Sequence, residues 1–290
     1  MNFIDETSED LSALIVRDLG PLPQGVLTNR IVLDWMHYRA RLIPCRPRLV
    51  VVAPQVAALR DTYPAINQLK AALEVGADVS PWLSERVRKQ RSNLTADLMF
   101  NDWQISHFHL GRLFERANKI GPRPHGRPLL FAHVKADRAI LLDVQPHGSW
   151  TMQRILGILR DLSPDDLPEL KGILPPGSGS SPTDEQLRNL RQNGYTAPTE
   201  ISGKVFAAPG LGQSTLHHAT RMLVQAHHLA KRLAHLHEAL AENRLPWYIQ
   251  MQLAGRIGLP VRLGLTLDAG CLVVYEKMRG IEFFRLPAFE

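Results

Sequence analysis

Two histidines share one face of a predicted strand in the segment NDWQISHFHLG, residues 101–111. Successive side chains of a strand point to opposite sides, so His107 and His109 lie side by side. His133 falls on a second predicted strand, and His147 falls at the end of a third. Imidazole titrates near neutral pH, so each of these rings can accept or release a proton under physiological conditions. The set therefore indicates acid–base chemistry.

Three basic side chains accompany these histidines, one on a predicted strand and two in flanking loops: Lys135, Arg112 and Arg127. Cleavage of RNA without a metal needs a base for the 2′-hydroxyl proton, an acid for the departing 5′-oxygen and a cation for the phosphate oxygens. We therefore predict a metal-independent endoribonuclease that uses no cofactor. The predicted base is His107 or His109. The predicted acid is His133 or His147.

The same region permits a second enzymatic interpretation, in which its side chains hold zinc or manganese. The H-x-H pair presents two nitrogens on one side of a strand, and His147 and Asp143 could complete the ligand set. Few other acidic residues lie nearby, which favours the metal-free reaction. A phosphoesterase with two H-x-[ST] motifs is less well supported, because His218 begins such a motif but His107 does not.

A small antiparallel sheet is expected to position these residues. Two apolar runs, at residues 129–135 and 139–145, flank a short polar connection as in a β-hairpin. Apolar residues at helical spacing follow Ser149, which is suited to cap a helix. The elements predicted before this sheet are helices at residues 1–20, 26–43, 55–77 with a break at Pro64, and 80–98, with a short strand or helix lead-in at 47–53.

The stretch GILPPGSGSSPTDE, residues 172–185, has the composition of a linker. We therefore predict an α+β protein of two domains. Residues 1–171 would contain the helical lead-in and the histidine-bearing antiparallel sheet. Residues 186–290 would form a mostly helical domain that ends in a second small sheet, with a hairpin at 262–276 and a strand near 281–285.

The helix predicted at residues 214–243 contains six of the twelve histidines of the chain. Its apolar positions fall on one broad face. The opposite face gathers the basic residues His217, Arg221, His228, Lys231, Arg232 and His235. This face is either an ordinary solvated surface or a stripe that binds RNA. It supports the alternative that the protein is a nucleic-acid- or protein-binding component without catalytic activity.

Composition favours a polyanionic partner, because 34 Lys and Arg residues exceed 28 Asp and Glu residues and give a net charge of +6. The N-terminal residues lack the pattern of a secretory signal, and no apolar run is long enough to span a bilayer. The two cysteines match no metal or redox spacing. We expect a cytoplasmic protein that binds no membrane. The phosphate-binding loop, the dinucleotide fingerprint and the G-x-S-x-G elbow are all missing from the sequence.

Residues 80–160 resemble a group of uncharacterised bacterial and mobile-element proteins. The shared features are the pattern D-W-x-I-x-H-x-H-L, an L-L-F-A strand and the motif H-G-x-W. By the order of its elements the chain also resembles small β-sheet ribonucleases of the RelE, barnase and colicin type, many of which are bacterial toxins, although it is much longer. This resemblance implies a toxin or effector of a bacterial defence or toxin–antitoxin system, with an antitoxin or defence protein as partner.

Overall fold

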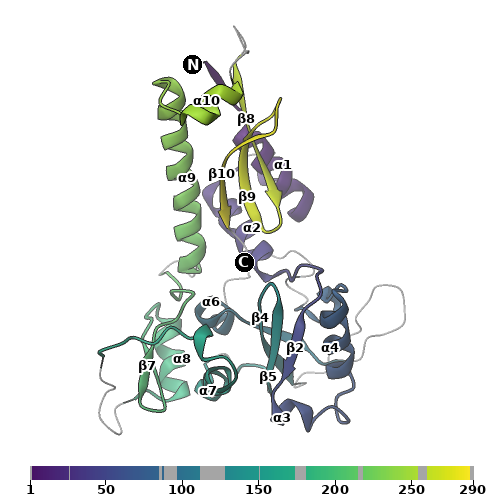
Figure 1. Ribbon diagram of the computed structural model, residues 1–290. Coiled ribbons are helices and arrows are strands. Elements are labelled where there is room, and N and C mark those ends of the chain that lie inside the picture. The colour runs from purple at the N-terminus through teal and green to yellow at the C-terminus, as the bar shows by residue number, and fades with distance from the viewer. Residues whose placement is uncertain are drawn as a thin grey trace. The chain divides into compact units, whose positions relative to one another are not determined.

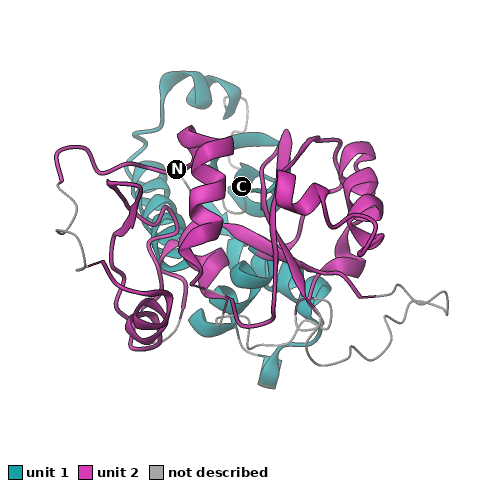
Figure 2. Ribbon diagram, turned by 90° about the horizontal axis from the view of Figure 1, so that it is seen from below, with its two compact units in different colours: residues 1–40, 222–290 teal, residues 41–221 magenta. Residues whose placement is uncertain are grey.

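The structure, a computed structural model, describes most of the chain: residues 2–25, 27–84, 87, 97–111, 128–149, 151–173, 181–214, 218–253 and 260–287. Helices and small sheets alternate along the chain, so the predicted α+β class is confirmed (Figure 1). The chain divides into two compact units, coloured separately in Figure 2. Unit 1 comprises residues 1–40 and 222–290, and unit 2 comprises residues 41–221.

Unit 1 is built on a four-stranded sheet with the order β1-β8-β9-β10. Its strands are β1 (Phe3–Asp5), β8 (Val261–Asp268), β9 (Cys271–Glu276) and β10 (Ile281–Pro287). Its helices are α1 (Thr7–Leu19), η1 (Pro23–Gly25), α2 (Asn29–Arg41) up to residue 40, α9 (Thr220–Ala241) from residue 222, and α10 (Trp247–Leu253). The predicted C-terminal hairpin and final strand are confirmed.

The first residues of the chain form a strand where the sequence predicted the start of a helix. Phe3 pairs with Val261, and Asp5 pairs with Leu263, in a parallel ladder. A short segment of this kind has little helical preference of its own, so the backbone partners offered by β8 decide its conformation. The helix begins only at Thr7, whose backbone N–H donates to the Asp5 carboxylate at 2.9 Å.

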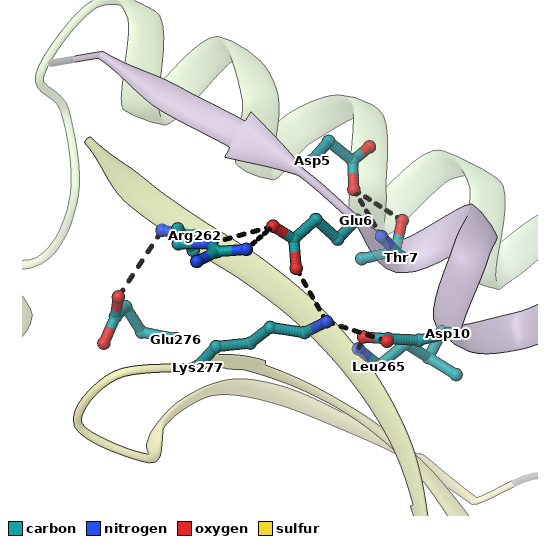
Figure 3. Close-up of polar contacts among 8 residues, drawn as sticks. All are labelled: Asp5, Glu6, Thr7, Asp10, Arg262, Leu265, Glu276 and Lys277. Atoms are coloured by element: carbon teal, nitrogen blue, oxygen red, sulfur yellow. Dashed lines mark hydrogen bonds and ion pairs between the residues drawn. The ribbon is translucent and has the colours of Figure 1, made fainter.

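A network of charges joins the N-terminal segment to β8 and to the end of β9 within unit 1 (Figure 3). The Lys277 ammonium lies 2.7 Å from a Glu6 carboxylate oxygen and 2.8 Å from one of Asp10. The second oxygen of Asp10 accepts the Leu265 backbone N–H at 2.9 Å, and Arg262 Nε donates to Glu6 at 2.8 Å. These contacts explain why the two ends of the sequence fold together.

Replacing Lys277 with methionine should lower the free energy of unfolding by about 1 kcal/mol, because two carboxylates lose their shared cation at a partly exposed position. Chemical unfolding with urea measures this loss, which should shrink at high salt because salt screens the pair in the wild type. The matched variant is Lys231→Met on the exposed side of α9. Equal effects of the two substitutions would show that the network contributes nothing.

Unit 2 contains a second four-stranded sheet, with the order β2-β5-β4-β3. Its strands are β2 (Leu49–Val52), β3 (Ile105–His109), β4 (Leu129–Val134) and β5 (Arg138–Gln145), with a separate pair β6 (Thr199–Ile201) and β7 (Lys204–Phe206). Its helices are α3 (Pro54–Ala57), α4 (Ala65–Val75), η2 (Ser80–Trp82), α6 (Leu98–Trp103), α7 (Gln153–Leu162), η3 (Pro164–Asp166) and α8 (Asp184–Gln192). The predicted hairpin is confirmed as β4–β5, and β2 adds a parallel edge to it.

The helix predicted at residues 55–77 is broken before Pro64, as expected, into α3 and α4. The start predicted for the next helix at Ser80 is a single 3-10 turn, since Leu83 is already extended. Much of the remainder of that predicted helix lies outside the described residues. Ser149 does not cap α7. Instead, Gln153 donates its backbone N–H to the Asp184 carboxylate at 3.0 Å, a partner that a local pattern cannot indicate.

The core of unit 2 lies between α7 and one face of the sheet. Ile105 and Phe131 are fully buried there against Ile155 and Leu159 of the helix. Burial of each such side chain stabilises the fold by about 2 kcal/mol. Because the strand face alternates, Ile105 shares its face with the two histidines that follow it, and these rings therefore lie at the rim of the core.

The division into units differs from the one predicted at the linker 172–185, which falls inside unit 2. The chain before and after this stretch is joined by backbone hydrogen bonds. Leu170 N–H donates to Val205 at 2.8 Å, and Ala207 N–H donates to Pro168 at 3.1 Å. Composition marks such a stretch as irregular, but it does not tell a surface loop from a domain boundary.

Both cysteines are free thiols, with Cys45 exposed and Cys271 buried. None of the helices in the described part of the chain combines the length and the apolar character needed to cross a bilayer.

Candidate active site

The edge strand β3 presents two of the predicted catalytic histidines. In the antiparallel ladder with β4, His107 lies opposite Phe131 and His109 opposite Leu129. The two imidazole rings have centroids 5.6 Å apart and meet edge to face at 67°. Both side chains are half-buried at the rim of the core, so neither points straight into water. The predicted alternation thus brings two titratable rings into contact.

A carboxylate orients the first ring. His107 Nδ1 lies 3.0 Å from Asp97 Oδ2, and both side chains are mostly buried, at 13% and 12% exposed. The other Asp97 oxygen accepts the Phe100 backbone N–H at 3.1 Å and so caps α6. A hydrogen bond from Nδ1 to a carboxylate fixes the tautomer and the orientation of an imidazole, as a general base needs.

Asp97 remains ionised in this setting. Burial works against its charge, but the charge and hydrogen bond of His107, the charge of Arg41 and the Phe100 N–H together hold its pKa below the usual value. Asp97 was not among the predicted site residues, although an aspartate directly before the apolar run Leu98 to Phe100 is a recognisable helix-cap signal.

A third histidine reaches the same place from the end of β5. The His147 ring is exposed and lies 6.5 Å, centroid to centroid, from the His109 ring. The turn at Pro146 and Gly148, where Gly148 adopts a φ of 102°, carries this ring back over the strand end. His107, His109 and His147 thus form a row of three rings with Asp97 at one end; we call this row the histidine row.

Two arginines that were not among the predicted site residues lie near the histidine row. Arg154 Nε of α7 lies 3.1 Å from Asp143, which pairs across the sheet with Phe131, the neighbour of His107. Arg188 of α8 donates to the carbonyl oxygen of Gly148 at 3.2 Å, next to His147. Both side chains are largely exposed, and Arg154 is paired with the Asp143 carboxylate.

His133 and Lys135 belong to a different group of contacts. His133 Nε2 lies 3.6 Å from the Asp166 carboxylate, which also accepts hydrogen bonds from Lys135, from Arg138 at 2.9 Å and from Ser163 at 2.8 Å. The side chain of His133 is only 6% exposed. These contacts join the β4–β5 hairpin to η3. Lys135 is therefore paired with the Asp166 carboxylate and lies apart from the histidine row.

Burial of His133 should make stability depend on pH. Burial lowers its pKa, and the attraction of Asp166 only partly offsets this. Since the folded state then binds the proton less readily than the unfolded chain, whose histidine titrates near about 6.5, stability is full above that pH and falls as the pH drops below it. We expect His133→Gln to lose less stability between about pH 7.5 and about pH 5 than the wild type, as measured by urea unfolding. An unchanged pH dependence would contradict this account.

The predicted basic face of α9 is only partly available. His228, Lys231 and His235 are exposed, as expected. Arg232 is exposed as well, but its guanidinium donates to the Arg285 carbonyl oxygen at 3.3 Å and lies 5.6 Å from the centre of the Phe284 ring of β10. Arg221 falls in unit 2 and is partly buried, and this burial lowers its pKa. The remaining predicted cations lie outside the described residues: Arg112, Arg127 and His217.

A small pocket in unit 2 is lined by Asp102, Arg191, Thr151 and Gln153 among others. Its polar groups already have partners. Thr151 donates to the Asp184 carbonyl oxygen at 2.8 Å, and Arg191 Nε donates to Asp102 at 2.6 Å. We therefore assign these groups a structural role.

Within the described residues, no group of three or more histidine, cysteine, aspartate or glutamate side chains is arranged to hold a metal ion. Asp143, considered above as a ligand beside His147, instead accepts hydrogen bonds from Gln145 at 2.7 Å and from its own neighbour Val144, in addition to pairing with Arg154. Comparison of the chain with models of protein families, with curated proteins and with solved structures found no match.

Proposed function

We propose that this protein is a metal-independent endoribonuclease whose active site is the histidine row. The observation that carries the proposal is the contact of Asp97 with His107, followed by His109 and His147 at ring distances of 5.6 and 6.5 Å. A carboxylate-oriented imidazole next to further imidazoles supplies an acid and a base in one place.

The order of the three rings suits this role. His109 lies between His107 and His147, so a base and an acid at the two ends of the row could act on the same phosphate. A state with one neutral and one protonated ring is the one that acid–base catalysis requires. We assign the role of base to His107, because Asp97 orients its ring, and the role of acid to His147, because it is the most exposed of the three.

In the proposed reaction, His107 Nε2 removes the proton from an RNA 2′-hydroxyl, and the 2′-oxygen attacks the adjacent phosphorus. The bond from phosphorus to the 5′-oxygen breaks, and His147 gives its proton to that oxygen. The products are a 2′,3′-cyclic phosphate and a free 5′-hydroxyl. His109, between the two rings, and Arg154 would stabilise the charge on the phosphate oxygens.

The test is incubation of the purified full-length chain with single-stranded RNA in an excess of chelator. We expect cleavage that the chelator does not reduce, with products ending in 2′,3′-cyclic phosphate. Cleavage that stops in chelator and returns with zinc or manganese would instead support the metal-dependent alternative. Binding of RNA without any cleavage would overturn the enzymatic proposal.

The second candidate function is binding without catalysis, through the exposed residues His228, Lys231 and His235 of α9. Glu238 of α9 and Glu242, directly after the end of this helix, are also exposed, which reduces the attraction for a polyanion. This candidate predicts that Lys231→Glu abolishes RNA binding while changes in the histidine row leave it unaltered.

For the cellular setting, we propose the cytoplasm and a role as the toxin or effector of a bacterial defence or toxin–antitoxin system. Support comes from the ribonuclease chemistry itself, which harms a cell unless an inhibitor or antitoxin controls it. Co-expression with the neighbouring reading frame of its locus, compared with expression alone, tests for such a partner.

A further inference from the structure

Arg41 contacts the first turn of α6, the same turn that binds Asp97, the partner of the proposed base His107. Its side chain is buried, at 6% exposed, with Nη2 donating to Asn101 Oδ1 at 3.2 Å and the guanidinium 5.0 Å from the centre of the Phe100 ring. Asp97 is bound to the same turn, because it accepts the Phe100 N–H. The turn therefore holds a buried cation and the carboxylate that orients His107 in fixed positions.

We infer that Arg41 is a positioning residue of the proposed active site: its buried guanidinium offsets the charge of Asp97, so that Asp97 orients His107 without trapping a proton on it. The inference rests on the proposed function for its catalytic meaning. A carboxylate alone attracts a proton to the imidazole it contacts, whereas a carboxylate with a fixed cation behind it exerts a weaker pull. A general base must be unprotonated before each turnover.

The surrounding charges are consistent with this assignment. Those near Asp97 are His107 of β3, Arg41, and Asp102 of α6, whose negative charge is matched by Arg191. Arg41 is thus a buried cation, held on the same turn as Asp97, whose charge acts on that carboxylate in addition to the charge of His107. Its charge helps to keep the pKa of Asp97 below the usual value, after the opposing effect of burial and the larger effect of His107.

Nuclear magnetic resonance of the full-length chain tests the inference without any RNA. In Arg41→Met, the titration midpoint of the Asp97 carboxyl carbon should rise by about one pH unit. At about pH 7, the ring nitrogens of His107 should show a protonated fraction about threefold larger than in the wild type. Arg41→Lys, which keeps the charge, should restore both readings, and Arg160→Met elsewhere in unit 2 should change neither.

If the chain also cleaves RNA, Arg41→Met should lower kcat at neutral pH with little change in KM, and raising the pH should recover the rate. A rate that no pH recovers would indicate a merely structural role. Should Arg41→Met not fold, Asn101→Leu removes the acceptor of Nη2 and should shift both resonances in the same directions by a smaller amount. If the Asp97 and His107 resonances do not shift in a folded variant, the inference about Arg41 is wrong, even if the protein cleaves RNA. If they shift but the protein does not cleave RNA, the inference holds and the ribonuclease proposal fails.

Discussion

Replacing His107 with alanine should reduce kcat/KM for single-stranded RNA by about 10²–10⁴-fold, the range for loss of a positioned general base. The expectation follows from its half-buried ring, its hydrogen-bonding contact with Asp97 at 3.0 Å and its contact with His109. Initial rates of cleavage of a fluorescent oligonucleotide measure the loss. The wild type should show a bell-shaped dependence of kcat/KM on pH, because one ring must be neutral and another protonated.

A second substitution, at Asp97, tests whether this carboxylate acts through His107. Asp97→Asn should lower the rate by allowing the wrong tautomer of the ring, but it should add nothing to the loss already caused by His107→Ala. Residues that work as one unit show this lack of additivity. Additive effects in the double variant would mean that the carboxylate has a separate function.

The matched control is His227→Ala, which removes an exposed histidine of α9 and should leave cleavage within about twofold of the wild type. Circular dichroism of each variant checks that the fold is retained. If His227→Ala is as damaging as His107→Ala, or if the folded His107→Ala variant keeps full activity, the histidine row is not the active site.

The local pattern of the sequence was sufficient to predict the strands of the site. Alternation placed His107 and His109 on one face, and the polar connection before Arg138 predicted the β4–β5 hairpin. These features depend on neighbours in sequence and on the fixed geometry of a strand. The strand β1 and the cap of α7 could not be predicted in this way, because each depends on a partner far along the chain: β8 for the one and Asp184 for the other.

The residues that belong to the site were harder to predict than the strands that carry them. The position of a residue along a strand does not show which loop or helix packs against it. The strand pattern therefore could not show that His133 lies beside Asp166, away from the site, or that His147 lies beside His109. Asp97 had a local signal as a helix cap but no sequence relation to His107. Such contacts are set by tertiary packing.

Replacing Arg191 with methionine should lower the free energy of unfolding by about 3–5 kcal/mol. The Arg191 and Asp102 side chains are only 4% and 9% exposed, and the guanidinium donates to both oxygens of the carboxylate. Arg191 also donates to the Tyr195 carbonyl oxygen at 2.9 Å and to Thr196 Oγ1 at 2.8 Å. Methionine would fill similar space but would leave a buried carboxylate without its cation. Thermal unfolding should show a midpoint lower by about 10 °C.

The stability lost in Arg191→Met should depend on pH, and the direction of this dependence shows whether the unpaired Asp102 carboxylate causes the loss. Burial already raises the pKa of Asp102, although Arg191 opposes the rise. Without Arg191 the rise is larger, so the folded variant takes up a proton at a higher pH than the unfolded chain and recovers stability as the pH falls towards about 4. The loss measured at about pH 7 should therefore exceed the loss at about pH 5, whereas a pure packing defect would cost the same at both.

Two further variants separate the ion pair from the rest of the helix. Arg188→Met, at an exposed position of α8, should change stability by less than about 0.5 kcal/mol. Changing both partners, as Asp102→Leu with Arg191→Met, should recover part of the loss, because no unpaired charge then remains buried. A double variant less stable than Arg191→Met alone would show that the lost hydrogen bonds to Tyr195 and Thr196, and not the orphaned carboxylate, account for the destabilisation.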